Sequence, residues 1–235
     1  MRKVEICFSP ELIHLHSLKG KIVVVVDIFR ATSTMVAALA NGVSEIRTFA
    51  DLEECRQMSD QGYLIAGERN GLIAEGFELG NSPIAYLNDA YAGQKLAMTT
   101  TNGTLAISKS SEADEIVIGA FPNLSATVSY LQTLDQDILI HCSGWKGMFN
   151  LEDSLYAGAL AKSLEATHEA AEDGAIAMKA LFEKEGYDLK GFLSQASHAK
   201  RLQNHHIEVD IDFCLTLDLF EFSCKLSSNN SLIKV

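Results

Sequence analysis

The run KIVVVVDIF, residues 21–29, constrains the fold more than any other segment of the chain. A continuous stretch of β-branched residues is typical of a strand that is buried on both faces of a largely parallel sheet. Further strands are predicted at residues 3–8, 44–49, 63–68, 95–99, 115–121 and 137–144. Segments with helical spacing of apolar residues fall between them, at 31–42, 51–62, 123–134 and 151–166. This alternation predicts an α/β fold of three layers, α/β/α, around a largely parallel or mixed sheet.

The chain is long enough for one α/β domain. We therefore predict a single domain over residues 1–235, with two lobes as the alternative. The first helix is predicted to be capped by Thr32 or Ser33 and to end at Asn41-Gly42. The later part of the chain reads as more helical, and its segment EVDIDFCLTLDLFEF, residues 208–222, is predicted to supply a last strand or edge segment.

Composition narrows the class of partner. Nineteen basic against 31 acidic residues give a formal charge of −12, which argues against nucleic acid or a membrane as partner, since both need a basic face. An anionic substrate must then be held by local positive charge or by a metal ion. The five cysteines form no C-x-x-C pair, and the first residues contain no apolar signal segment, so we expect a cytoplasmic protein with reduced thiols. A homodimer is a working assumption that no sequence feature supports directly.

Polar and charged residues gather where predicted strands end. Ligands of open α/β sheets bind at the carboxyl ends of the strands, so four such junctions predict one shared cleft. The residues at these junctions are Asp27, Arg30, Thr32 and Ser33; Glu68, Arg69, Asn81 and Ser82; Thr101, Asn102 and Gly103; and Ser143, Lys146, Glu152 and Asp153.

This set of residue types suits phosphoryl transfer. Helix starts expose backbone N–H groups to a phosphate or sulfonate, and arginines such as Arg30 and Arg69 grip oxyanions with two N–H groups. Carboxylates are the ligands that Mg²⁺ prefers, and Asp27, Glu68 and either Glu152 or Asp153 could supply them. The plainer alternatives are that Asp27 only caps a helix, that Arg30 pairs with Asp27, and that the acids of residues 152–153 only favour the helix dipole.

Several known motifs fail. The sequence contains no G-x-x-x-x-G-K-[ST] and no G-x-G-x-x-G after a strand. HCSGWKGM begins like the H-C-x5-R loop of tyrosine phosphatases, but Met148 stands at the arginine position. A metal-independent phosphatase with Cys142 as nucleophile stays open as an alternative. A non-catalytic binder of phosphorylated or sulfonated metabolites is another.

Taken together, the segments resemble the Mg²⁺-dependent 2-phosphosulfolactate phosphatases (ComB-type) of coenzyme M biosynthesis. The matching stretches are VVVVDIFRATSTMVAALANG, GERNGLIAEGFELGNSP, TTTNGTLAI, NLSA, CSGWKGMFNLEDSLYAG, SHAKRL and DFCLTLD. Two departures concern the substrate: Leu105 follows TTNGT where many relatives have arginine, and the carboxyl end lacks the valine-proline typical of the family.

The resemblance implies hydrolysis of 2-phosphosulfolactate to 3-sulfolactate and phosphate, with Mg²⁺ as cofactor. It implies catalytic roles for Asp27, Arg30 and Glu68, with Asp27 either attacking phosphorus or binding the metal. The implied metal ligands are Asp27, Glu68, Glu152 and Asp153. The substrate-binding residues it implies are Arg30, Thr32, Ser33, Arg69, Asn81, Ser82, Thr101, Asn102, Gly103, Ser143 and Lys146.

Overall fold

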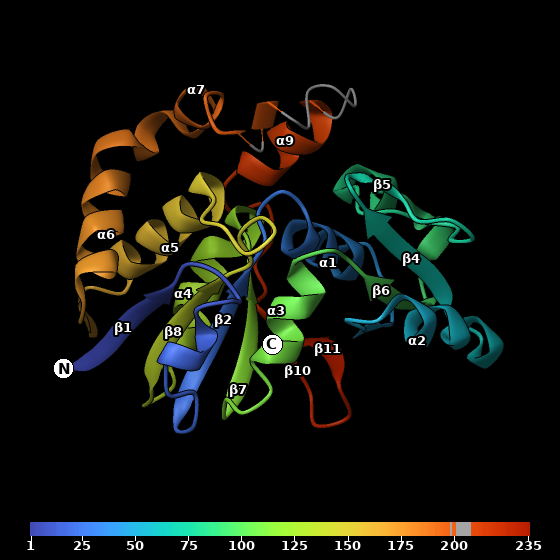
Figure 1. The fold of residues 1–235 in the computed structure, drawn as a ribbon, viewed down its shortest axis with the longest axis horizontal. Helices are drawn as coiled ribbons and strands as arrows, with labels where there is room; N and C mark the ends of the chain where they lie inside the picture. The colour runs from blue at the N-terminus through green and yellow to red at the C-terminus, as the bar shows by residue number, and fades with distance from the viewer. Residues whose placement is uncertain (198, 201–207) are drawn as a thin grey trace.

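The computed structural model describes residues 1–197, 199–200 and 208–235. Three residues of the SHAKRL segment, His198, Arg201 and Leu202, therefore lie outside the described residues. The described strands form one sheet in the order β5-β4-β6-β3-β11-β10-β7-β2-β8-β1-β9 (Figure 1). Their bounds are β1 Arg2–Cys7, β2 Lys21–Val26, β3 Glu45–Thr48, β4 Leu64–Arg69, β5 Leu72–Ile73, β6 Lys95–Thr99, β7 Glu115–Gly119, β8 Asp137–Cys142, β9 His168–Ala170, β10 Cys224–Leu226 and β11 Ser231–Lys234.

Helices lie on both faces of this sheet (Figure 1). Their bounds are α1 Ala31–Ala40, α2 Leu52–Arg56, α3 Gly103–Lys109, α4 Leu124–Gln132, α5 Leu151–Ser163, α6 Asp173–Glu185, α7 Leu189–Leu193 and α9 Glu208–Leu215. The predicted α/β fold around a mixed sheet is confirmed. In the part of the chain that the structure describes, no helix is both long and apolar enough to cross a membrane.

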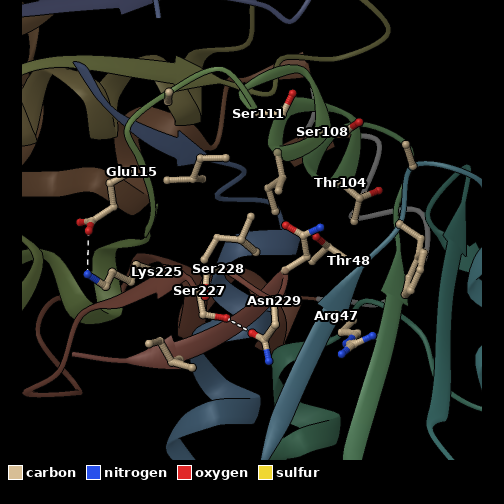
Figure 2. Close-up of a pocket in the computed structure, with 18 of the residues that line it drawn as sticks. Arg47, Thr48, Thr104, Ser108, Ser111, Glu115, Lys225, Ser227, Ser228 and Asn229 are labelled. Atoms are coloured by element: carbon tan, nitrogen blue, oxygen red, sulfur yellow. Dashed lines mark hydrogen bonds and ion pairs between the residues drawn. The ribbon is translucent and has the colours of Figure 1, made fainter. Parts of the chain in front are cut away.

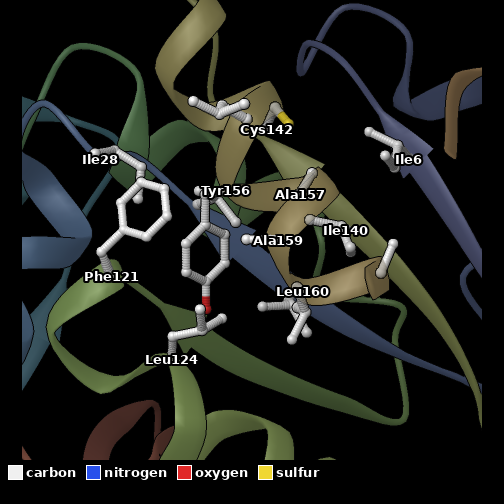
Figure 3. Packing of buried hydrophobic residues seen from close by; sticks show 14 of the residues in the cluster. Ile6, Ile28, Phe121, Leu124, Ile140, Cys142, Tyr156, Ala157, Ala159 and Leu160 are labelled. Atoms are coloured by element: carbon white, nitrogen blue, oxygen red, sulfur yellow. The ribbon is translucent and has the colours of Figure 1, made fainter. Parts of the chain in front are cut away.

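Strand β2 shows why a continuous apolar run is needed at the centre. Val24 packs into a core cluster with α4 and α5, whereas Val23 and Val25 pack into a second cluster with α1 and α3 on the opposite face. Figure 3 shows the first cluster, in which the ring of Tyr156 meets Phe121 edge to face, with ring centroids 5.2 Å apart. Burying each such side chain contributes roughly 1.5–3 kcal/mol, so both faces of β2 stabilise the fold.

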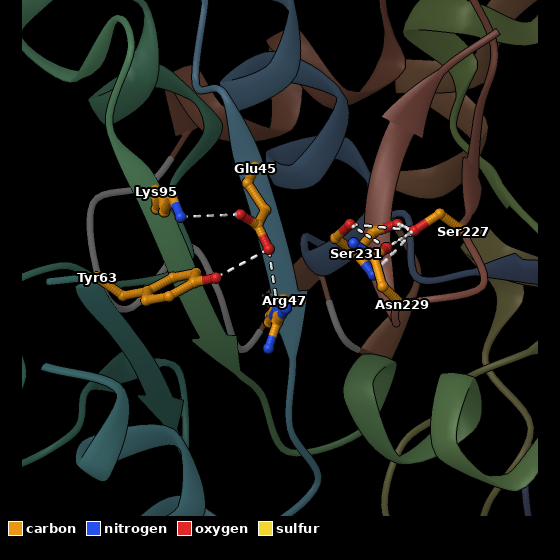
Figure 4. Close-up of polar contacts among 7 residues, drawn as sticks. All are labelled: Glu45, Arg47, Tyr63, Lys95, Ser227, Asn229 and Ser231. Carbon is orange, nitrogen blue, oxygen red and sulfur yellow. Dashed lines mark hydrogen bonds and ion pairs between the residues drawn. The ribbon is translucent and has the colours of Figure 1, made fainter. Parts of the chain in front are cut away.

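The parallel strands form two groups joined by a hairpin. Strands β7, β2, β8, β1 and β9 form one parallel group, and β3, β6 and β4 form another, with β5 antiparallel to β4 at the edge. The hairpin β10–β11 lies between β7 and β3 and is antiparallel to both. Figure 4 shows its turn, where Ser227 donates to the carbonyl of Ser231 at 2.8 Å, and also Glu45 of β3, which accepts from Tyr63 at 2.8 Å.

Two sequence predictions about local structure are wrong. Residues 208–215 form helix α9 rather than a strand: Val209, Ile211 and Phe213 alternate as a strand would, but burial follows the i, i+3, i+4 set of Ile211, Cys214 and Leu215. The amino-terminal end of α1 lacks a Thr32 or Ser33 cap, because the helix begins at Ala31, after Arg30. Its end at Asn41-Gly42 is confirmed.

Candidate active site

Asp27 lies in the turn after β2 and is buried, with 7% of its surface exposed. The hydroxyl of Thr32 accepts from the backbone N–H of Asp27 at 3.0 Å and donates to its carbonyl at 2.9 Å. Ser33 donates to the carbonyl of Ile28 at 3.0 Å. Both hydroxyls therefore shape the turn, and contact between either of them and a substrate stays a prediction.

The carboxylate of Asp27 lies between two helix starts. Its Oδ1 accepts from the N–H of Ala31 at 3.3 Å, which fits the plainer alternative of a helix cap in part. Its Oδ2 lies beside Gly103, where an added Cβ would come within 2.8 Å of that oxygen and 2.6 Å of the Ala31 side chain. Glycine at the start of α3 thus allows the TTTNGT loop to approach Asp27.

Asp153 ties the turn after β2 to the turn after β8. It is fully buried in the first turn of α5, where its Oδ1 accepts from the N–H of Ile28 at 2.8 Å. Its Oδ2 accepts from the N–H of Gly144 at 3.1 Å and from the amide of Asn150 at 2.9 Å. Asn150 also donates to Glu152 at 3.0 Å, so one amide orients both acids. The sequence prediction did not include Asn150, whose only signal is its place before the helix.

The pKa of Asp153 lies well above its usual range. Burial is the largest cause, followed by repulsion from the charges of Asp27 and Glu152, while the hydrogen bonds from Ile28 and Asn150 oppose the shift. The structure therefore brings together three of the four predicted metal ligands closely enough to repel one another.

Arg30 is buried at the start of α1, 5% exposed, and forms an ion pair with Asp210 of α9. Asp210 also accepts from the hydroxyl of Ser82 at 2.6 Å, and Arg30 donates a longer bond to the carbonyl of Gly71, at 3.4 Å. Neighbouring Asn81 is buried, and its side-chain oxygen has no hydrogen-bond partner among the described residues. Asp210 is a site residue that sequence reasoning missed, because it follows no strand and matches no motif on its own.

Glu68, the fourth predicted metal ligand, joins two loops. One oxygen accepts from the backbone N–H of Thr101 at 3.1 Å and from its hydroxyl at 3.0 Å. The other oxygen accepts from the N–H of Gly71. All three donors belong to the protein, so Glu68 holds the loops of Gly71 and Thr101 together. The loop of Thr101 leads into Gly103, which lies beside Asp27.

Two predicted cations lie nearer the surface than Arg30. Arg69 is half-buried and donates to the carbonyl of Glu68 at 2.6 Å and to the hydroxyl of Thr99 at 3.1 Å. Lys146 is exposed, and its ammonium donates to Asn70 at 3.4 Å. The backbone N–H of Lys146 donates to Asn102 at 3.2 Å, which links the loop after β8 to the loop after β6.

Two residues at the carboxyl end of β8, Cys142 and Ser143, are buried. Cys142 is fully buried, and burial, followed by the charge of Asp153, raises the pKa of its thiol well above the usual range. A thiol in that environment stays protonated, which argues against the cysteine phosphatase alternative. Ser143 is also buried, and its hydroxyl has no hydrogen-bond partner among the described residues.

The donor set decides how a metal ion could fit. Among the described residues, no group of three His, Cys, Asp or Glu side chains is arranged to hold one. Mg²⁺ is commonly held by only one or two carboxylates, with water and substrate phosphate completing its shell. Asp27 fits that pattern as a carboxylate at the start of two helices, and a cation there would relieve its repulsion with Asp153. Asp153, like Glu68, already accepts three hydrogen bonds from the protein through both of its oxygens.

The structure contains a hollow away from the predicted site residues. Figure 2 shows this hollow of about 980 Å³, with Ser108 of α3 on one side and Ser228 of the hairpin turn on the other. None of the residues predicted for the site lines it. This hollow is therefore separate from the predicted site.

Comparison with known proteins gives a consistent result. The family described as 2-phosphosulpholactate phosphatase matches residues 7–229. A protein of Thermotoga maritima named probable 2-phosphosulfolactate phosphatase is 44% identical over 198 residues, covering 84% of this chain and 86% of its own. Proteins with the same name from Caldanaerobacter subterraneus and Microcystis aeruginosa are 37% and 38% identical, and each match covers at least 90% of both chains.

Proposed function

Because the chain belongs to the 2-phosphosulfolactate phosphatase family and is thereby a phosphoric monoester hydrolase, we propose that its substrate is 2-phosphosulfolactate and its cofactor Mg²⁺. The products are then 3-sulfolactate and inorganic phosphate, in a step of coenzyme M biosynthesis, and the compartment is the cytoplasm. The observation that carries the proposal is the approach of two buried carboxylates, Asp27 directly after β2 and Asp153 in the first turn of α5.

The substrate would carry a phosphate, a carboxylate and a sulfonate. Arg30, Arg69 and Lys146 lie at or after the carboxyl ends of β2, β4 and β8, and each has N–H groups that suit such oxyanions. In a protein with a formal charge of −12, this local cluster of cations supports a substrate with several negative charges.

A metal at this site would be held by Asp27, with the buried acids Asp153 and Glu152 close by. Bound Mg²⁺ neutralises the charge that develops on a transferred phosphoryl group. The protein's own contribution is to hold these carboxylates in place. Asn150 and the N–H groups of Ile28 and Gly144 fix Asp153, and Thr32 fixes the turn that presents Asp27.

Asp27 can act in two ways that fit this position. As a nucleophile its carboxylate would form a bond to phosphorus and release the alkoxide of 3-sulfolactate, after which water would hydrolyse the acyl phosphate. As a metal ligand it would leave the attack on phosphorus to water. Both roles need the negative charge of Asp27, so replacing it by asparagine tests the site whichever role is correct.

The test is phosphate release from 2-phosphosulfolactate by the purified protein, with Mg²⁺ and with EDTA. We expect release that EDTA abolishes, and a loss of roughly 100-fold or more in kcat for Asp27→Asn, in line with losing a central catalytic group. The matched control is Asp60→Asn, because Asp60 is an exposed aspartate outside the predicted site. Full turnover by Asp27→Asn, or full turnover in EDTA, would contradict the proposal.

A further inference from the structure

Asp210 of helix α9 lies beside the predicted site and forms an ion pair with Arg30. Asp210 is 3% exposed and uses both oxygens: Oδ2 accepts from Nη1 of Arg30 and Oδ1 accepts from Ser82 at 2.6 Å. These contacts join α9, the start of α1 and the loop that precedes the short helix Pro83–Tyr86. Three segments far apart in the sequence thus meet at the Asp210 carboxylate.

We propose that Asp210 is a positioning residue, which holds Arg30 in the orientation that binds an anionic group of the substrate. This inference rests on the proposed function, since it assigns Asp210 to the same site. Ser82 takes part by restraining Asp210 and not by contacting the substrate, which revises its predicted role.

The geometry of the guanidinium supports this role. Arginine has five N–H groups, and the two that donate to Asp210 and to the carbonyl of Gly71 leave three without a partner among the described residues. Because the group is planar, two fixed contacts set the direction of the remaining N–H groups. An arginine oriented in advance loses less conformational freedom when it binds an oxyanion.

The surroundings of Asp210 argue that the ion pair persists when substrate binds. Ile211, Cys214 and Leu215 are buried on the same helix and hold the backbone of Asp210 in place, while Ser82 restrains its side chain by a hydrogen bond to Oδ1. A carboxylate that only blocked Arg30 would need freedom to move away. Separating the pair would also leave a buried charge without compensation, which is costly.

The experiment is a double-mutant cycle of Arg30→Ala and Asp210→Asn, with steady-state kinetics on 2-phosphosulfolactate. Asparagine keeps the shape and one acceptor oxygen but removes the charge. We expect Asp210→Asn to raise KM about tenfold with kcat changed less than about threefold, as a charged hydrogen bond of this kind implies. In the Arg30→Ala background the same change should have no further effect on KM, because Asp210 acts through Arg30.

Ser82→Ala should change KM in the same direction by a smaller factor. The matched control is Asp212→Asn, on the same helix, where the carboxylate is exposed and pairs with Lys190 at 2.5 Å. This control should leave KM unchanged. A fall in KM for Asp210→Asn would show that Asp210 competes with the substrate, and additive effects of Arg30→Ala and Asp210→Asn would show a purely structural role; either result overturns the inference.

A second measurement separates this inference from the substrate assignment. The affinity of each variant for inorganic phosphate, measured by titration calorimetry, does not depend on turnover. If 2-phosphosulfolactate is not hydrolysed, the proposed function fails, while about tenfold weaker phosphate binding by Asp210→Asn would still support the positioning role. Equal phosphate affinities of the wild type and Asp210→Asn, or no binding by the wild type, would contradict it.

Discussion

Glu68→Gln tests whether this acid anchors loops, as the structure indicates, or binds metal, as the sequence predicts. The carboxylate accepts three hydrogen bonds, from the N–H of Gly71 and from the N–H and hydroxyl of Thr101. A glutamine can keep its oxygen toward Thr101, but its NH₂ group then faces the N–H of Gly71. One hydrogen bond is lost, and the half-buried N–H of Gly71 is left facing another donor.

The expected cost is about 1–3 kcal/mol of unfolding free energy, since Glu68 is only 6% exposed and water cannot replace the lost acceptor. For a chain of 235 residues this corresponds to a fall in Tm of roughly 2–10 °C. Thermal and urea unfolding measure the loss, and hydrogen exchange at the amide of Gly71 should become faster. The matched control is Glu78→Gln, because Glu78 is an exposed acid in the segment after β5. This change should leave Tm within about 1 °C.

Calorimetric titration with Mg²⁺ separates the two interpretations. If Glu68 anchors loops, the folded Glu68→Gln variant should bind Mg²⁺ with an affinity within about threefold of the wild type, because the carboxylates that hold the metal are unchanged. Lost Mg²⁺ binding with an unchanged Tm would refute this reasoning and make Glu68 a ligand.

Three further predictions concern groups away from the reacting carboxylates. Cys142→Ser should keep kcat within about threefold, since a buried thiol of raised pKa is no nucleophile, whereas a loss of turnover in a folded variant would restore the cysteine mechanism. His141 is buried and its pKa is lowered to about 3, so the unfolded chain binds its proton first as the pH falls from about 6.5. Stability should therefore fall below pH 6.5 more steeply in the wild type than in His141→Gln, and parallel urea-unfolding profiles would contradict this. Asp218→Ala should lower the unfolding free energy by about 0.5–2 kcal/mol, because Asp218 accepts from the N–H and hydroxyl of Ser125 at the start of α4, and an unchanged midpoint of urea unfolding would argue against it.

The part of the fold that the sequence predicts well has strong periodicity. Strand β2 and the helix after it lie where the apolar run and the helical spacing place them. The hairpin β10–β11 has no comparable signal: its strands are three and four residues long, and they are defined by pairing with β7 and β3. Pairing between distant segments is a property of the whole chain, so local patterns do not reveal it.

The site shows the same division. The rule that polar residues cluster at the carboxyl ends of strands was enough to bring Asp27 and Asp153 together. It could not foresee Asp210, because the alternation in VDIDFCL reads as a strand and hides the buried face of a helix. Nor could it tell that Glu68 uses its oxygens within the protein, since hydrogen-bond partners such as Thr101 depend on loop conformation.

The partners of the three cations explain how an overall acidic protein can still bind an anion. Arg30 is paired with a carboxylate, so its charge is largely balanced and its contribution is direction. Arg69 and Lys146 donate to neutral oxygens of the protein, and among the described residues neither forms an ion pair. Their charge is not balanced by an ion pair among the described residues, so it would attract an anionic substrate over a distance, and salt would weaken that attraction. In the proposed function, Arg69 and Lys146 would attract a substrate with several negative charges, and the buried Arg30 would orient it.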